Sequence, residues 1–178
     1  MTDTPTPAPP VDNVQDFADM SAALTGFLSS VLKPALDPLG LAGTYYNFAA
    51  THGGADVMAQ LMSAYRAIKD QPSQQIADTL LETATADPTA LSKTAYLAQS
   101  IVAMWYLGSW YPPGVLEGGG FAPAQQVISS VAYTNGLAWR AMQSHPMGYS
   151  PFVFGYWSQQ PDTLPSFGVN TGNGGGGQ

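Results

Sequence analysis

The sequence contains no cysteine among its 178 residues. The chain therefore cannot form a disulfide, bind an iron–sulfur cluster through thiolates or carry a covalently attached c-type haem. Cations are also scarce, because Lys and Arg total five and are scattered along the chain. Binding to nucleic acid needs a basic patch that neutralises phosphates, so this composition excludes a nucleic-acid partner.

Charge of either sign is rare. Asp, Glu, Lys and Arg make up 10% of the residues, against about 25% in an average soluble domain. Hydrophobic residues reach 45% and the net charge is −7, so one domain with a substantial core is expected. A surface poor in charge is typical of a protein that covers part of itself with a partner. A surface rich in Ala, Gly and Ser is the alternative explanation.

Catalytic motifs are missing as well. The sequence has no G-x-S-x-G, H-E-x-x-H, P-loop or G-x-G-x-x-G pattern. Its two histidines, His52 and His145, are far apart, and its two glutamates, Glu82 and Glu117, pair with neither. His145 precedes Pro146, and a helix-ending role explains it. An independent hydrolase or lyase that uses His145 remains an alternative, but the inventory favours a protein without catalytic residues.

Helical periodicity runs through most of the chain. Asp12 can cap a helix whose apolar stripe is Phe17, Met20, Leu24, Phe27 and Val31. Further helices are expected at about 39–51, after Gly53–Gly54, at about 74–84, from the Asp87–Pro88 cap onwards, and at about 124–143. The last carries Val127, Val131, Ala138 and Met142 at helical spacing, and its Gly136 indicates a close backbone approach. None of the first four segments shows the alternation of a strand.

These segments predict an all-α fold, a single irregular bundle of about six helices with an extended aromatic-rich C-terminal tail. Residues 1–11 are expected to be a disordered lead, and 12–148 the helical domain. Residues 149–169 form the tail, packed on the bundle or on a partner, and 170–178 a disordered glycine-rich end. Residues 94–116 carry no charge, but their polar residues and early prolines favour a buried helix over a membrane span, so no transmembrane span is predicted.

Six short motifs occur in succession along the chain. MSAALTG lies at 20–26, WYLGSW at 105–110, AY at 132–133, GLAWRA at 136–141, HPMG at 145–148 and GYW at 155–157. Their succession resembles the small subunit of membrane-bound FAD-dependent sorbitol, fructose and glucose dehydrogenases. The resemblance spans about residues 17–161.

The resemblance implies an accessory role. In such complexes a large subunit of the glucose–methanol–choline type binds FAD, with an iron–sulfur cluster as an option, and oxidises a sugar or polyol. A multihaem cytochrome c, where present, passes electrons on. The small subunit has no cofactor and supports maturation and export of the large one, which implies the periplasmic side of the cytoplasmic membrane. This sequence has no Arg-Arg pair and starts with a Pro- and Thr-rich segment, so a cytoplasmic location also remains open.

Aromatic residues beside the charge-free stretch are the expected partner interface. The predicted interface residues are Trp105, Tyr106, Gly108, Trp110, Trp139, His145, Pro146, Phe152, Phe154, Tyr156 and Trp157. The alternative from another class is a self-contained helical binding module, or a peripheral membrane protein, whose aromatics line an apolar pocket.

Overall fold

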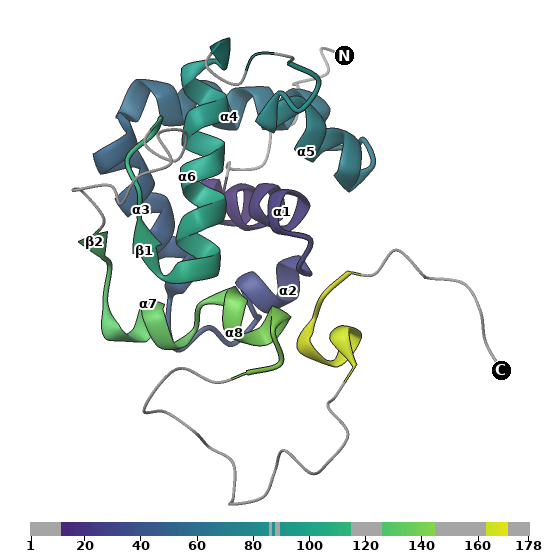
Figure 1. The fold of residues 1–178 in the computed structure, drawn as a ribbon, viewed down its shortest axis with the longest axis vertical. Helices are drawn as coiled ribbons and strands as arrows, with labels where there is room; N and C mark the ends of the chain where they lie inside the picture. Colours follow the sequence, from purple (N-terminus) through teal and green to yellow (C-terminus); the bar gives the residue numbers. More distant parts are fainter. Residues whose placement is uncertain (1–11, 86, 88–89, 115–125, 145–162, 171–178) are drawn as a thin grey trace, which may run out of the picture.

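The computed structural model describes residues 12–85, 87, 90–114, 126–144 and 163–170. Over these residues the fold is mostly helical, with one two-stranded antiparallel sheet (Figure 1). The predicted all-α class and bundle architecture are therefore confirmed. The predicted lead, the tail up to residue 162 and the end from residue 171 lie outside the described residues.

Helix α6 (Lys93–Leu107) is the central element of the bundle. It packs against α1 (Asn13–Thr25), α3 (Leu41–Gly53), α4 (Ala55–Ile68), α5 (Ser73–Leu81) and α8 (Leu137–Ala141), as Figure 1 shows. Residues on several faces of α6 are buried, among them Leu97, Ile101, Met104 and Trp105. Burial on several sides explains why α6 lacks charge after Lys93. Within the described residues, no helix combines the length and the apolar character that a membrane span requires.

The first helix starts as predicted but ends early. Asp12 accepts hydrogen bonds from the N–H groups of Val14 and Gln15. The expected helix to Val31 is wrong, because Gly26 ends α1 with a φ of 77° and α2 (Ser29–Leu32) follows. Between them Phe27 forms a β-bridge with Val169, which fastens the 163–170 segment to the bundle. The apolar stripe still faces the core, since Phe27 is buried.

Helix α6 also starts later than predicted. Ser92, rather than Asp87, is its N-cap and accepts a hydrogen bond from the Ala95 N–H. The backbone N–H of Ser92 in turn donates to Glu82 at the end of α5. The first bond satisfies a backbone N–H in the first turn of α6, and the second joins α6 to the end of α5. Together they explain why α6 begins at Lys93 rather than near Asp87.

The predicted helix at 124–143 is wrong. Its place is taken by β2 (Gln126–Val127), α7 (Ser130–Thr134) and α8. Strand β2 pairs with β1 (Ser109–Trp110), which the sequence pattern did not indicate. Ser129 then starts α7 by accepting a hydrogen bond from Ala132 N–H, and Gly136, with extended backbone, separates α7 from α8.

Candidate functional site: an uncharged apolar groove

The end of α6 brings distant segments together through a turn at Gly108. Its φ of 63° is a left-handed conformation, and its N–H caps α6 by donating to the Met104 carbonyl. A Cβ at this position would lie 2.5 Å from the carbonyl carbon and oxygen of Ala132. Only glycine allows both the turn and this approach of the α7 backbone.

A second close approach lies at Gly136. A Cβ there would lie 2.7 Å from the Tyr106 carbonyl oxygen, so the prediction of close backbone packing at Gly136 is confirmed. Just beyond it, the Trp139 indole N–H donates to the Tyr133 carbonyl (2.8 Å), and the two rings meet edge to face at 5.5 Å. The α7–α8 segment is thus fixed beside the end of α6.

A groove of about 290 Å³ lies between the end of α6, the sheet and the α7–α8 segment. We call it the apolar groove. It is lined by four aromatic rings and by aliphatic and small residues, none of them charged: Tyr106, Leu107, Ser109, Tyr111, Val127, Tyr133, Ala138, Trp139 and Met142. Of these, Leu107, Val127 and Met142 are 43%, 55% and 61% exposed, so large apolar side chains of the groove face solvent.

Tyr106 connects the groove with the rest of the bundle. Its hydroxyl donates to the Thr25 carbonyl at the end of α1 (2.8 Å), and its ring contacts Phe27 edge to face. Burial raises the pKa of the Tyr106 hydroxyl. The side chain is therefore held in place, and it forms a preformed wall rather than an adaptable one.

The predicted interface residues divide into three groups in the structure. Tyr106 and Trp139 line the apolar groove, and Gly108 forms the turn beside it. His145, Pro146, Phe152, Phe154, Tyr156 and Trp157 lie outside the described residues.

The structure corrects the prediction made for Trp105 and Trp110. Each is only 3% exposed, because Trp105 packs against Phe17 and Tyr45 and Trp110 against Phe48. Both are therefore core residues of this chain, and the prediction that they contact a partner is wrong for this fold.

The exposed aliphatic residues were not predicted as part of the site. Val127 and Met142 line the groove, whereas Val131 is exposed outside its lining. All three were expected on the apolar stripe of one long helix, yet each is more than 40% exposed. The strand and the two short helices turn them outward. The available signal was local: Ser129 as a cap and Asn135–Gly136 as a break both interrupt the predicted helix.

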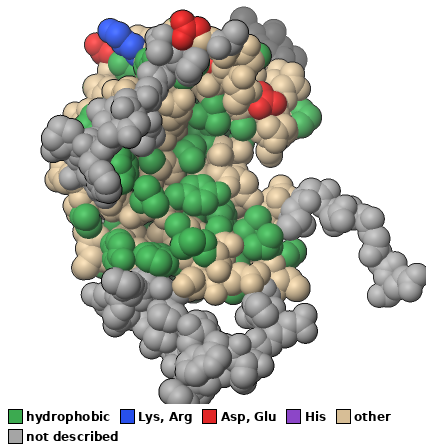
Figure 2. Space-filling view, viewed as in Figure 1, with side chains coloured by type: hydrophobic (Ala, Val, Ile, Leu, Met, Phe, Trp, Pro, Cys, Tyr) green, Lys and Arg blue, Asp and Glu red, His purple; other side chains and the backbone are tan. Residues whose placement is uncertain are grey.

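Charge is distributed unequally over the molecule. Residues 94–178 contain only three charged side chains, Glu117, Arg140 and Asp162. Figure 2 shows acidic and basic groups toward the α4 and α5 end, and hydrophobic side chains over the part formed by β1, α7 and α8. The one ion pair among the described residues, Arg66 with Asp16 at 2.6 Å, joins α4 to α1 away from the groove.

The described residues contain no group of three or more His, Cys, Asp or Glu side chains that could hold a metal ion. In comparisons with known proteins, no family model, no curated protein and no solved structure matches the chain. The groove and the sequence motifs are therefore the observations that bear on function.

Proposed function

We propose that this protein is a non-catalytic accessory subunit that binds a larger protein through the apolar groove. The observation that carries the proposal is the exposure of Leu107, Val127 and Met142 around a rigid aromatic wall with no charge. Interface cores are depleted in charge and enriched in aromatic residues and Met. A contiguous apolar patch on a soluble chain marks an interaction site more often than a free surface.

The resemblance supplies the proposed partner. It is the large FAD-containing subunit, of the glucose–methanol–choline type, of a bacterial sugar or polyol dehydrogenase. FAD, with an iron–sulfur cluster as an option, would belong to that subunit, and haem c to a cytochrome subunit where one is present. The proposed location is the periplasmic side of the cytoplasmic membrane. In this role the chain stabilises the flavoprotein and leaves oxidation of the CH–OH group to it.

The test is co-expression of the tagged chain with a large FAD-dependent dehydrogenase subunit from the same organism. The double variant Val127→Glu/Met142→Glu places two carboxylates in the groove at positions that are already exposed. It should lose the co-purified flavin absorbance while the chain keeps its helical circular dichroism, because exposed substitutions change stability by only about 0.5 kcal/mol.

The matched control is Leu36→Glu. Leu36 is 88% exposed and lies between α2 and α3, outside the lining of the groove. This variant adds the same kind of charge to an exposed leucine and should retain the flavoprotein. Equal retention by the double variant would refute docking in the groove, and no retention by the unmodified chain would refute the proposed partner.

A self-contained helical binding module is the second candidate, and a separate pocket beside α8, described below, favours it. It predicts stabilisation of the isolated chain by a small ligand, without any partner protein. Partner binding and ligand binding are distinguishable because they use opposite faces of α8. Leu137 and Arg140 line the pocket, whereas Ala138 and Met142 line the groove.

A further inference from the structure

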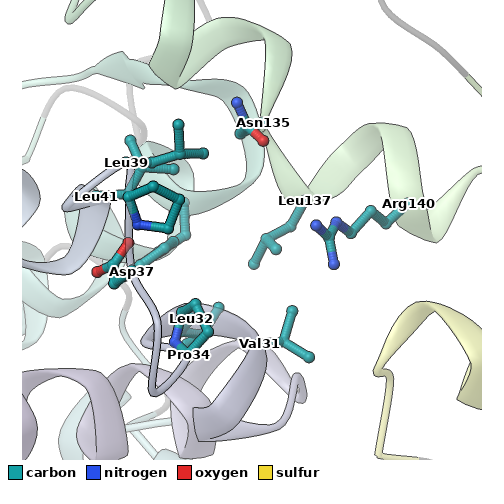
Figure 3. Close-up of a pocket in the computed structure, with 11 residues that line it drawn as sticks. Val31, Leu32, Pro34, Asp37, Leu39, Leu41, Asn135, Leu137 and Arg140 are labelled. Atoms are coloured by element: carbon teal, nitrogen blue, oxygen red, sulfur yellow. The ribbon is translucent and has the colours of Figure 1, made fainter. Parts of the chain in front are cut away.

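A pocket of about 250 Å³ lies on the other side of α8 from the apolar groove, between α8 and the connection from α2 to α3 (Figure 3). We call it the α8 pocket. Most of its lining is apolar, and three polar side chains stand at its edges: the residues are Val31, Leu32, Pro34, Asp37, Pro38, Leu39, Leu41, Trp105, Asn135, Leu137 and Arg140. Sites for small molecules are typically apolar with few polar groups.

Arg140 gives the pocket its positive charge. Figure 3 shows its side chain extending from α8 toward Leu137 and Val31. Among the described residues the only ion pair is between Arg66 and Asp16, so the Arg140 guanidinium has no carboxylate partner there. It is also the only cation in residues 94–178. A guanidinium presents a planar fork of donors that matches a carboxylate.

Asp37 limits which anion fits. Its carboxylate accepts a hydrogen bond from the Gly40 N–H (2.8 Å) in the connection to α3. In Figure 3 it lies across the pocket from the Arg140 guanidinium. A ligand with a carboxylate at each end would bring its second charge toward Asp37, and like charges repel. One negative charge is therefore favoured over two.

One lining residue of the pocket has a hydrogen-bond donor without a partner among the described residues. Trp105 lines the pocket and is buried, and its indole N–H has no hydrogen-bond partner among the described residues. The Asn135 amide group donates to the Val131 carbonyl (2.9 Å), which fixes this side chain at the edge of the pocket.

From this arrangement we infer that the α8 pocket binds a small amphipathic monocarboxylate. The carboxylate pairs with Arg140, and the apolar part lies against Leu39, Leu41 and Leu137. The volume is slightly below the range of about 300–1,000 Å³ for typical ligand pockets, so the ligand is a short-chain or medium-chain acid. This inference does not depend on a partner subunit, because the site lies wholly within this chain.

The test is a titration of the isolated full-length chain, labelled with ¹⁵N, with hexanoate followed by amide chemical shifts. Adipate and 1-hexanol are the comparison probes, since they keep the six-carbon length and change the charge. Hexanoate should bind with a Kd of about 1 mM or below, and its shifts should centre on residues 31–41 and 135–141. Adipate and hexanol should bind about tenfold more weakly or not at all.

Two variants separate charge from shape. Arg140→Gln should weaken hexanoate binding about tenfold by removing the charged hydrogen bonds, and Arg140→Lys should fall between. Lys69→Gln, which removes a cation at the end of α4 outside the pocket, should change nothing. Leu39→Trp, at a half-exposed lining position, should block binding by filling the space.

The proposal is overturned by three results: no shifts with hexanoate up to about 10 mM, equal binding of adipate or hexanol, or unchanged hexanoate affinity in Arg140→Gln. None of these would affect co-purification of a flavoprotein through the apolar groove. Conversely, loss of flavoprotein binding in Val127→Glu/Met142→Glu would leave hexanoate binding intact.

Discussion

At the scale of single residues, two tyrosine hydroxyls make opposite contributions to stability. The buried Tyr45 hydroxyl has no hydrogen-bond partner among the described residues, whereas the Tyr106 hydroxyl donates to the Thr25 carbonyl (2.8 Å). An unpaired buried polar group costs about 1–3 kcal/mol, and a typical hydrogen bond contributes about 1 kcal/mol. Tyr45→Phe should therefore raise the free energy of unfolding in urea, and Tyr106→Phe should lower it. Destabilisation by Tyr45→Phe would show that its hydroxyl is satisfied.

Buried tyrosines also predict sensitivity to alkali. Burial, with smaller effects of Asp19, Asp16 and Asp70, raises the pKa of Tyr65 to about 12, and burial raises the pKa of Tyr45. An unfolded tyrosine ionises near pH 10, so between about pH 10 and 12 the unfolded state binds fewer protons than the folded state.

The stabilising effect of Tyr65 is complete below pH 10 and is lost as the pH rises toward 12. The effect of Tyr45 has the same direction, because burial raises its pKa as well. We expect the urea midpoint to be constant from about pH 8 to 9.5 and to fall above pH 10. In Tyr65→Phe the fall should be shallower, because one group that titrates differently in the two states is removed. An identical decline in wild type and variant would contradict the assignment.

Gly108 carries the closest backbone contact beside the groove. Alanine there combines a left-handed φ of 63° with a Cβ at 2.5 Å from the Ala132 carbonyl. The left-handed conformation alone costs about 1–2 kcal/mol, so Gly108→Ala should destabilise the fold by more than this. Gly43→Ala is the control, since Gly43 lies inside α3 with nothing near its Cβ position. It should stabilise the helix by about 0.5–1 kcal/mol. Thermal unfolding compares the two variants, and equal stabilities would contradict the contact.

Local chemistry could be predicted from the sequence where it depended on neighbours in the chain. The Asp12 cap and the close approach at Gly136 are both found in the structure. Whether a tryptophan faces the core or the surface depends on what packs against it. Trp105 meets residues from α1 and α3, and no local pattern specifies those contacts.

At the scale of elements, the connection from α5 to α6 depends on one serine. The Ser92 side chain caps α6 (3.2 Å to the Ala95 N–H), and its backbone N–H donates to Glu82 (3.0 Å). Hydrogen bonds from Ser92 lower the pKa of the Glu82 carboxyl. Ser92→Ala should lower the free energy of unfolding by about 1 kcal/mol.

Ser73→Ala is the matched control for Ser92→Ala. Ser73 is exposed and is the first residue of α5, whose N-cap is Pro72 and has no side-chain cap bond. Its replacement should leave the denaturation midpoint within the range of ordinary surface substitutions, about 0.5 kcal/mol. Equal effects of the two substitutions would mean that the cap at Ser92 does not stabilise α6.

Helical periodicity located α3, α4 and α5 well, because each combines an apolar stripe with clear breaks. It failed where tertiary pairing interrupts a helical pattern. Phe27 pairs with Val169, and Gln126–Val127 pairs with Ser109–Trp110, and both partners are distant in sequence. Non-local hydrogen bonds of this kind override propensity. For this reason, the helical spacing of Val127 and Met142 did not predict their positions in the groove.

At the scale of the whole molecule, the charge asymmetry predicts how the isolated chain behaves. Most charged residues precede residue 94, so like-charge repulsion does little to keep two apolar grooves apart. Leu107, Val127 and Met142 expose their side chains there, and uncovered apolar patches promote association. The isolated chain should therefore self-associate with rising concentration, and sedimentation velocity measures this directly. Val127→Glu/Met142→Glu should keep it monomeric, while Leu36→Glu should not, although Leu36 is more exposed than either. A chain that stays monomeric at high concentration without these substitutions would argue that the groove is too small or too polar to drive association, and would weaken the case for a docking surface.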